Sequence, residues 1–313
     1  MLDLAQLHRT ADFVHGFVQP TPQLEWPLLS RELGCQVFVK HENHLPTGAF
    51  KVRGGLVLLH ALREQGVKDV IAATRGNHGQ SIAFAARVFG MKATLVVPKG
   101  NSVSKNAAMR GFGAELIEHG RDFQDAYDWM QEMAKESGVH PVPSFDPLLV
   151  EGVATYGLEL FEAGGNLDAV YVPIGWGSGM CGLISARAAL GCRTALIGAV
   201  AEQANSFAQS FAAGRVIETA VPETIADGIA VRRPHPEGLS WVRSGAERIV
   251  EVSEIAILRA MRLYFDTIHN VAEGAAAAAL AAAIKDDAGR RFKRIALVLS
   301  GSNVDSSLYK TVF

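Results

Sequence analysis

The sequence predicts an α/β fold with two doubly wound parallel sheets. Short apolar runs rich in β-branched residues alternate with amphipathic helical stretches along most of the 313 residues, a pattern typical of parallel sheets covered by helices on both faces. A compact β-α-β-α-β run, closed by the polar stretch 136–147, further indicates a small inserted domain at 69–149. The large domain would then comprise 1–68 plus 150–313, and the cleft between two such domains is a common place for a cofactor.

The expected elements follow one another in a regular order. We expect strands at 36–40, 69–74, 92–98, 114–119, 169–174, 194–201 and 294–300. We expect helices at 52–66, 78–90, 102–113, 122–138, 155–165, 183–190 and 254–269. Each strand is a short apolar run, whereas each helix repeats its apolar residues every three or four positions. Most strands are followed by a helix, as the crossovers of a parallel sheet require.

Composition and charge narrow the class of partner. The net charge of −2 gives no indication of a nucleic acid or a membrane as partner. Cys35, Cys181 and Cys192 lack metal-ligand spacing and are typical of buried thiols in a reducing compartment.

The longest small-apolar run, 274–284, is too short to span a bilayer and predicts a buried helix. The N-terminus has no basic head and no apolar signal core, so we expect a cytoplasmic enzyme.

The glycine-rich loop 175–182 follows an apolar strand and precedes a helix. Gly177, Gly179 and Gly182 spell G-x-G-x-x-G, and Glu202 lies near the end of the next strand-like run. These are features of a dinucleotide fingerprint. Any other phosphate at the N-terminus of a helix would use the same free backbone amides. The loop by itself therefore leaves both interpretations open.

Lys51 stands at the expected start of a helix. The positive end of the helix dipole disfavours an ammonium ion, which predicts a pKa for Lys51 below the usual value of about 10.4. A neutral amine is what Schiff-base formation with a carbonyl requires. An exposed helix lysine is the competing interpretation, and the surrounding motif decides between the two.

The segment 40–55, KHENHLPTGAFKVRGG, resembles the K-x-E-N-x-x-x-T-G-S-F-K-x-R-G-A signature of fold type II pyridoxal-phosphate enzymes, which share the tryptophan-synthase β fold. Within that family it is most similar to the serine/threonine dehydratase and serine racemase group. The resemblance implies pyridoxal 5′-phosphate as cofactor, bound between two domains, with Lys51 as its Schiff-base lysine. It also implies that Phe50 packs near the cofactor ring.

The segment 75–81, RGNHGQS, resembles the family's S-x-G-N-H-x-Q loop. The resemblance implies that Asn77 contacts the 3′-oxygen of the pyridine ring and that the loop backbone binds the substrate carboxylate. The residues expected to bind substrate are Thr74, Arg75, Gly76, Asn77 and His78. Asn77 is also expected to cap the following helix, whose free first-turn amides favour an anion. For His78 we favour a structural role.

The segment 173–182, PIGWGSGMCG, is similar to the family's glycine loop, which cradles the cofactor phosphate. The cradle would be formed by Gly175, Trp176, Gly177, Ser178 and Gly179. Because pyridoxal phosphate also explains Lys51 and Asn77, we interpret the loop as its phosphate site and not as a dinucleotide site. Trp176 is left with two interpretations, a substrate-side aromatic or ordinary packing.

The segment 299–305, LSGSNVD, resembles the family's S-G-G-N-V, in which the residue matching Ser300 hydrogen-bonds the pyridine nitrogen. A neutral hydroxyl holds a pyridinium less firmly than an aspartate does, so the ring is a weaker electron sink. A weaker sink favours prompt expulsion of a β-substituent and disfavours transamination.

Smaller matches lie elsewhere in the chain. The segment 224–231 resembles a family loop near the cleft. Thr155 and Glu159 belong to a further match and are expected to be structural. Glu273 begins another, in which it either lines the site or has a structural role.

Two departures from the family bear on function. Ala49 stands where serine is usual before Phe50, which removes one hydroxyl near the cofactor. Arg75 occupies the position of the serine that acts as second base in serine racemases. A guanidinium is cationic at any ordinary pH and cannot be that base, so racemisation is not expected. Arg75 either contacts a substrate carboxylate, narrows the site toward certain β-substituents, or forms a surface ion pair.

A divalent metal is not expected. Several relatives bind one through a glutamate and an aspartate, and Val200 and Ser206 stand at those positions here. Glu202 lies nearby and keeps the question open.

The sequence thus predicts a pyridoxal-phosphate-dependent ammonia-lyase. It would eliminate the β-hydroxyl of a 3-hydroxy-amino acid such as L-threonine or L-serine, giving a 2-oxo acid and ammonia. A bulkier or acidic 3-hydroxy-amino acid is an alternative substrate because of Arg75 and Trp176. β-Replacement, racemisation and a non-catalytic cofactor-binding sensor remain as alternative functions. The expected partners are a small amino-acid substrate and a second copy of the chain in a homodimer.

Overall fold

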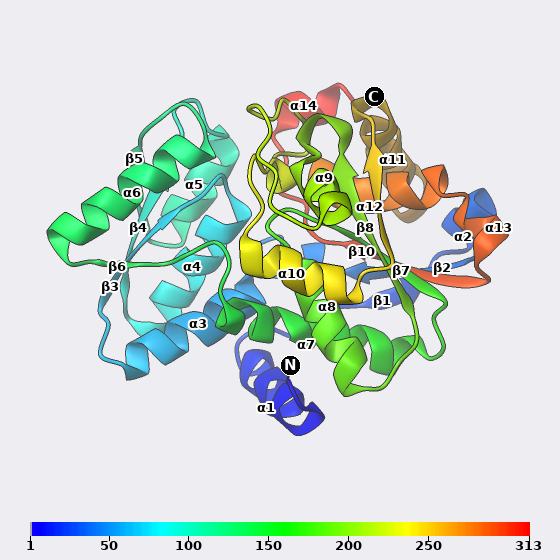
Figure 1. Cartoon of the computed structure of the whole chain (residues 1–313), viewed down its shortest axis with the longest axis horizontal. Helices are drawn as coiled ribbons and strands as arrows, with labels where there is room; N and C mark the ends of the chain where they lie inside the picture. The colour runs from blue at the N-terminus through cyan, green and yellow to red at the C-terminus, as the bar shows by residue number, and fades with distance from the viewer. Residues whose placement is uncertain (1) are drawn as a thin grey trace.

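The computed structural model describes residues 2–313, which form two separate β-sheets (Figure 1). The larger sheet has the strand order β1-β2-β10-β7-β8-β9. Its strands are β1 Gln23–Glu25, β2 Gln36–His41, β7 Ala169–Pro173, β8 Ala195–Ala201, β9 Arg248–Val252 and β10 Arg294–Leu299. Neighbouring strands are parallel except β1, which pairs antiparallel with β2.

The smaller sheet is parallel throughout, has the order β5-β4-β3-β6 and lies on the left of Figure 1. Its strands are β3 Asp69–Ala73, β4 Lys92–Val97, β5 Glu115–Glu118 and β6 His140–Pro141. The predicted α/β class is confirmed, and all the predicted strands are present. The sequence missed β1, β6 and β9, which are short or only half-buried and so lack a continuous apolar run.

Helices connect the strands and cover both sheets. They are α1 Leu4–His15, α2 Pro27–Leu33, α3 Val52–Glu64, α4 Asn77–Phe89, α5 Val103–Gly111, α6 Phe123–Ser137, α7 Pro147–Gly164, α8 Ser178–Ala189, α9 Ser206–Ala213, α10 Pro236–Gly245, α11 Glu254–Ile268, α12 Gly274–Lys285, α13 Ala288–Arg291 and α14 Ser306–Lys310. Single 3₁₀ turns are η1 Glu42–His44, η2 Glu202–Ala204 and η3 Asp227–Ile229.

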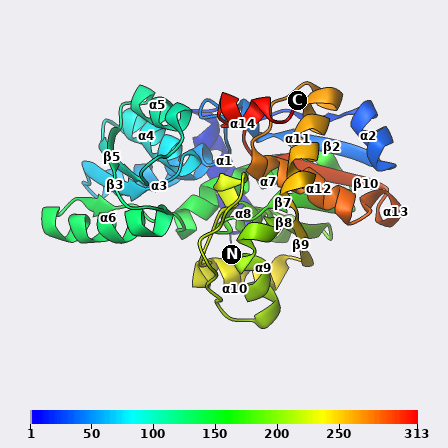
Figure 2. The same cartoon turned by 90° about the horizontal axis from the view of Figure 1, so that it is seen from above.

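Alternating side chains bury both faces of each sheet. In β3, Val70 and Ala72 join the core beneath α3 and α4, whereas Ile71 and Ala73 join the core beneath α6. Figure 2 shows α6 on one side of this sheet and α4 and α5 on the other. The larger sheet is covered by α2, α11 and α12 on one face and by α7, α8 and α10 on the other. Burial on both faces explains why these strands have near-continuous apolar sequences.

The alanine-rich run 274–284 forms α12, as predicted, and the helix is buried from Gly274 to Ala283. It packs against β7, β8, β9 and β10. Small side chains allow this close approach to the sheet. Within residues 2–313, none of the helices combines the length and apolarity that crossing a bilayer requires.

Helix α3 packs in the core of the smaller sheet. Leu56 and Leu59 are fully buried in the same cluster as Val70 and Leu95, although a boundary at residue 69 would assign α3 to the large domain. The division into 1–68 plus 150–313 and 69–149 stays a prediction. The two separate sheets support it, and the packing of α3 opposes its first boundary. Amphipathic periodicity identifies a buried helix face but does not say which sheet covers that face.

Helices α3 and α7 cross in direct backbone contact. A Cβ atom on Gly54 would lie 2.5 Å from the backbone oxygen of Leu149, and one on Gly152 would overlap the backbone oxygen of Arg53. Any larger residue would therefore push the two helices apart. Since α3 packs on the smaller sheet and α7 packs on α8 beside the larger one, this crossing joins the two halves of the molecule.

Beside this crossing, Arg53 is fully buried and is neutralised by two carboxylates. It donates from Nε to Glu42 Oε2 at 2.8 Å and from Nη1 to Glu159 Oε1 at 2.5 Å and Thr155 Oγ1 at 3.1 Å. Lys40 donates to the second oxygen of Glu159 at 2.5 Å. Although burial opposes it, Arg53 and Lys40 lower the pKa of Glu159 to about 2. Thr155 and Glu159 thus have the structural contacts expected of them.

Arg53→Met is expected to lower the free energy of unfolding by about 3–5 kcal/mol, because it leaves two buried carboxylates without their partner. Urea unfolding followed by circular dichroism measures the change. The control is Arg290→Met, which removes an exposed arginine paired with Asp287 on the surface and should cost less than about 0.5 kcal/mol. Equal effects of the two substitutions would contradict the role assigned to Arg53.

Candidate active site

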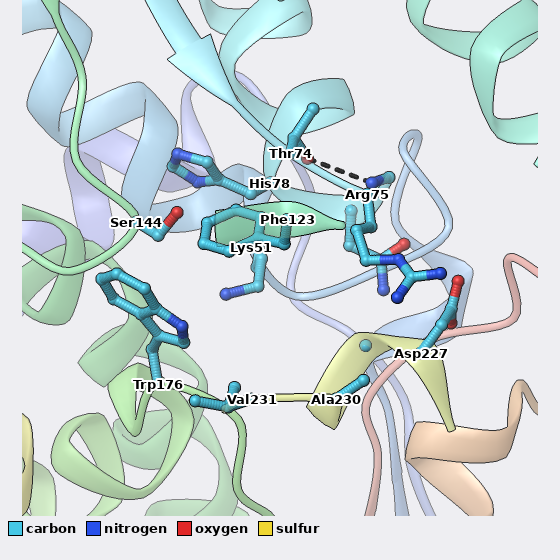
Figure 3. Close-up of a pocket in the computed structure, with 13 residues that line it drawn as sticks. Lys51, Thr74, Arg75, His78, Phe123, Ser144, Trp176, Asp227, Ala230 and Val231 are labelled. Carbon is cyan, nitrogen blue, oxygen red and sulfur yellow. Dashed lines mark hydrogen bonds between the residues drawn. The ribbon is translucent and has the colours of Figure 1, made fainter. Parts of the chain in front are cut away.

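A pocket lies between the two sheets, and the side chain of Lys51 lies within it (Figure 3). The lining residues are Lys51, Thr74, Arg75, Gly76, Asn77, His78, Phe123, Ser144, Trp176, Asp227, Gly228, Ala230 and Val231. All the residues predicted to bind substrate are among them, together with the predicted lysine and Trp176.

Thr74 shapes the loop between β3 and α4. Its buried Oγ1 accepts hydrogen bonds from the backbone amides of Gly76 at 3.0 Å (dashed in Figure 3) and Gly79 at 2.9 Å. The expectation that Asn77 caps the helix was wrong, because α4 begins at Asn77 itself and Thr74 supplies the bonds. The amides of Asn77 and His78 lie in the first turn, where a helix offers them no acceptor, so they are available to an anion.

The side chain of Asn77 is held at both ends. Its Nδ2 donates to Glu273 Oε1 at 2.7 Å, and its Oδ1 accepts from Asn303 Nδ2 at 2.8 Å. Asn303 also donates to the backbone oxygen of Thr47 at 2.8 Å. Gly301 leaves room for this network, since a Cβ there would lie 2.6 Å from Glu273 Oε1. These bonds fix the orientation of the Asn77 amide at the wall of the pocket.

Lys51 immediately precedes α3, as predicted. Burial lowers the pKa of its amine to about 8, against the opposing effect of the Glu273 carboxylate. The direction agrees with the expectation, but the main cause is desolvation and not the helix dipole. A neutral, nucleophilic amine is therefore available near pH 8.

Two further buried groups near Lys51 have shifted pKa values. Burial raises the pKa of Glu273 to about 7, with Lys105 opposing the shift. Burial and the charge of Lys51 lower the pKa of His78 to about 3, so its imidazole is neutral at physiological pH. Glu273 Oε2 and His78 Nε2 are buried without a hydrogen-bond partner among the described residues. His78 therefore contributes an uncharged imidazole to the wall of the pocket.

The glycine loop follows β7 and leads into a helix, as predicted, but α8 begins at Ser178, five residues before the expected start at 183. Gly177 has a φ of +102°, a conformation that glycine adopts far more readily than other residues. A Cβ on Gly175 would lie 2.9 Å from the backbone oxygen of Gly228, so the loop lies directly against the 3₁₀ turn η3. The first-turn amides of α8 are free to bind an anion.

Phe50 and Ser300 join this loop to the Lys51 segment. A Cβ on Gly179 would lie 3.5 Å from the ring of Phe50. The backbone amide of Phe50 donates to the backbone oxygen of Ser300 at 3.1 Å, and Ala49 forms a β-bridge with Gly301. The glycine loop and the Ser300 segment thus contact the residues next to Lys51, although Phe50, Gly179 and Ser300 are not among the residues that line the pocket.

Trp176 and Arg75 lie on opposite sides of the pocket in Figure 3, with the Lys51 amine between them. The ring of Trp176 packs against Phe123, with centroids 5.6 Å apart, and against His235 at 5.9 Å. Both interpretations of Trp176 therefore apply, since it packs and also faces the pocket. Arg75 is half-buried and lines the pocket, and no ion pair joins it to another residue between 2 and 313. The surface ion pair was the wrong interpretation of Arg75.

The pocket is also lined by residues that were not predicted, which are Phe123, Ser144, Asp227, Gly228, Ala230 and Val231. Phe123 follows β5 and Ser144 follows β6. Ligands of α/β proteins bind beyond the carboxyl ends of parallel strands. That rule could have found Phe123, which follows a predicted strand, but not Ser144, because β6 was not recognised in the sequence. Ala230 and Val231 belong to the loop that was expected near the cleft, although no residue in it had been given a role.

Comparison with protein-family models matches residues 14–301 to the family described as pyridoxal-phosphate dependent enzyme. The chain belongs to this family. The cofactor is therefore pyridoxal 5′-phosphate, and the dinucleotide interpretation of the glycine loop is set aside.

Relatives and solved structures agree with this family over nearly the whole chain. An L-threo-3-hydroxyaspartate ammonia-lyase of Saccharomyces cerevisiae is 33% identical over 301 residues, which cover 96% of this chain and 92% of the relative. A threonine deaminase of T.th. is 34% identical with a TM-score of 0.89, covering 97% of this chain and 99% of that one. Maize serine racemase is 27% identical with a TM-score of 0.92, covering 99% and 96%. The expected fold type II architecture is confirmed.

The residues present fit pyridoxal phosphate. The amides at the start of α8 and the hydroxyl of Ser178 suit its phosphate, and the Lys51 amine suits its aldehyde. The buried hydroxyl of Ser300 suits the pyridine nitrogen. At Gly179 the missing side chain leaves open space beside the Phe50 ring that a Cβ would fill. The individual assignments stay predictions.

No group of three His, Cys, Asp or Glu side chains forms a candidate metal site within the part of the chain described, residues 2–313. Val200 is buried in the core. The hydroxyl of Ser206 donates to the backbone oxygen of Val231 at 2.5 Å, and Glu202 pairs with Lys285 at 3.1 Å.

In the cofactor-free protein, the amine of Lys51 is expected to titrate with a midpoint of about 8, because burial disfavours its ammonium form. Competitive acetylation across a pH series, read by peptide mass spectrometry, measures this midpoint. The exposed Lys68 in the same sample serves as the reference site. A midpoint near the ordinary lysine value of about 10.4 would contradict the assignment.

Glu273→Gln is expected to lower the Lys51 midpoint further, because it removes a negative charge that favours the ammonium ion. The substitution keeps an oxygen that can accept from Asn77. The control is Asp266→Asn, which removes an exposed carboxylate paired with Arg262 on the surface and should leave the midpoint in place. A rise of the midpoint in Glu273→Gln would show that the two groups do not interact as described.

Proposed function

We propose that the chain is an ammonia-lyase that removes the β-hydroxyl of a 3-hydroxy-amino acid, giving a 2-oxo acid and ammonia. The observation that carries the proposal is the Lys51 amine, which lines the pocket between the two sheets and has a pKa of about 8. The activities for which the yeast ammonia-lyase and the T.th. threonine deaminase are named support this reaction class.

The chemistry divides between the cofactor and the protein. Bound pyridoxal phosphate supplies an electron-withdrawing ring that acidifies the α-hydrogen of an amino acid attached to it. In the proposed reaction, Nζ of Lys51 removes this hydrogen as a proton, because an amine with a pKa near the working pH is an effective base. The β-hydroxyl leaves with its bonding electron pair and takes up one proton to become water, which balances the proton that Lys51 accepted. The resulting enamine hydrolyses to a 2-oxo acid and ammonia, so the reaction needs no oxidant or second substrate.

The proposed site for the α-carboxylate is the first turn of α4. The backbone amides of Asn77 and His78 offer two donors at the positive end of a helix dipole, which favours an anion. Thr74 holds the preceding loop in place through its bonds to Gly76 and Gly79. The neutral imidazole of His78 adds no charge of its own.

Ser300 and Arg75 bear on the type of reaction. A neutral hydroxyl at Ser300 would hold the pyridine nitrogen less firmly than a carboxylate, so the cofactor ring would be a weaker electron sink. A weaker sink supports elimination over transamination. A base on the face opposite Lys51 is what a racemase needs, and a cationic Arg75 cannot supply it. Racemisation is therefore not favoured, although maize serine racemase shares the fold.

We also propose that the protein is a cytoplasmic homodimer. The family resemblance supports the dimer. Three cysteines without disulfide bonds, Cys35, Cys181 and Cys192, support a reducing compartment. Size-exclusion chromatography with light scattering should give a mass twice that of the chain, and the mass of a single chain would contradict the dimer.

The holoenzyme is expected to release 2-oxo acid and ammonia in equal amounts from L-threonine, L-serine or L-threo-3-hydroxyaspartate. Lys51→Ala should lower this rate by about 10³-fold or more, because it removes the proposed base and cofactor attachment. The exposed Lys68→Ala is the matched control. A protein that binds these amino acids without forming 2-oxo acid would be a sensor, and formation of D-amino acids without 2-oxo acid would indicate a racemase.

A further inference from the structure

Arg75 has a place in the pocket that the elimination reaction itself does not use. It follows β3 directly after Thr74, in a loop whose course is fixed by two hydrogen bonds to the Thr74 hydroxyl. The side chain extends across the pocket opposite Trp176 (Figure 3). It also lines an adjoining pocket that shares Phe123, Trp176, Ala230 and Val231 with the first.

Arg75 forms no ion pair within residues 2–313, although the Asp227 carboxylate lies on its side of the pocket in Figure 3. The Nε of Arg75 is buried without a hydrogen-bond acceptor among residues 2–313. The carboxylate of Asp227, which faces the same pocket, is bonded to the Lys105 ammonium at 2.5 Å. In the adjoining pocket, Asp122 accepts from Arg232 at 3.1 Å. A half-buried guanidinium without a partner is unfavourable, so an anionic ligand at Arg75 would be stabilised.

The pocket therefore offers two places for carboxylates. The first is the N-terminus of α4, where the amides of Asn77 and His78 are free. The second is the guanidinium of Arg75, whose planar fork suits a carboxylate. An amino acid with a neutral side chain has one carboxylate and would use one of these places. A 3-hydroxy-amino acid with a carboxylate on its β-carbon would use both.

The charge of the adjoining pocket points the same way. Arg75, Arg232 and Arg233 line it. Arg232 is paired with Asp122 and with Glu218, so the excess positive charge of this pocket comes from Arg75 and Arg233. This excess of positive charge raises the local concentration of an anionic substrate. The aromatic rings of Trp176 and Phe123 are packed against each other on the opposite wall and offer no partner for a second carboxylate.

We propose that Arg75 binds a carboxylate on the β-substituent, so that the preferred substrates are acidic 3-hydroxy-amino acids. This inference rests on the proposed function for the reaction and adds the substrate class. It assigns Arg75 to specificity and not to proton transfer.

The first test compares substrates that differ by the second carboxylate. The holoenzyme should show a higher kcat/KM for L-threo-3-hydroxyaspartate than for L-serine. Arg75→Met should lower the ratio of these two values by about 10- to 100-fold, since a charge-assisted hydrogen bond is lost for one substrate alone. Arg75→Lys should restore part of the ratio. The control is Arg110→Met, which makes the same change of charge at an exposed position of α5 and should leave the ratio unchanged.

The outcomes separate the two proposals. If no substrate gives a 2-oxo acid, the proposed function is wrong. If L-serine or L-threonine gives product but L-threo-3-hydroxyaspartate does not, the lyase stands and the inference about Arg75 is overturned. If Arg75→Met lowers kcat/KM for both substrates equally, Arg75 binds the α-carboxylate or only shapes the pocket, and the inference is again overturned.

A second test needs no turnover. L-Aspartate and L-alanine lack the β-hydroxyl, so their binding to the holoenzyme can be followed by the visible absorbance of the cofactor. Arg75→Met should raise the Kd of L-aspartate about 10- to 100-fold relative to that of L-alanine. Equal changes for the two ligands would overturn the inference even if the lyase reaction is confirmed.

Discussion

The buried Arg53 and its two carboxylates are the interaction on which the arrangement of the pocket depends. Arg53 lies two residues after Lys51, and it bonds Glu42, which follows a strand of the larger sheet, and Glu159 of α7. The start of α3 is thus tied to the larger sheet, while the rest of α3 packs on the smaller one. The position of the Lys51 amine is therefore set by charges buried behind the pocket. Arginine stays ionised at every physiological pH, so this support does not change when groups in the pocket titrate.

At the pocket, the groups that titrate near neutrality are Lys51 and Glu273, whereas Arg75 carries a permanent charge. The pKa values of Lys51 and Glu273, about 8 and about 7, lie close together. Near neutrality, Lys51 and Glu273 can therefore each gain or lose a proton with little change in free energy. His78 stays neutral throughout this range, and Arg75 stays a cation. Proton transfer at Lys51 or Glu273 would therefore take place at a pocket that also holds a fixed positive charge.

Local patterns predicted the parts of this structure that local forces decide. The strands have continuous apolar runs because both faces of each sheet are buried. The glycine loop is recognisable because the backbone at Gly177 has a positive φ. The cap of α4 was mispredicted because Thr74 and Asn77 are both capping residues, and only the direction of their side chains separates them. The depth at which Lys51 is buried depends on segments far away in sequence, such as that of Glu273, so the cause of its lowered pKa could not be inferred locally.

The backbone contact between α3 and α7 has a mechanical consequence. Two helices that touch through glycines, without a layer of side chains between them, cannot slide as easily as helices separated by long side chains. The crossing therefore fixes how closely α3 and α7 approach each other. Lys51 stands three residues before Gly54 in the chain, so the same contact limits how far the segment that carries the amine can shift against the larger half of the molecule.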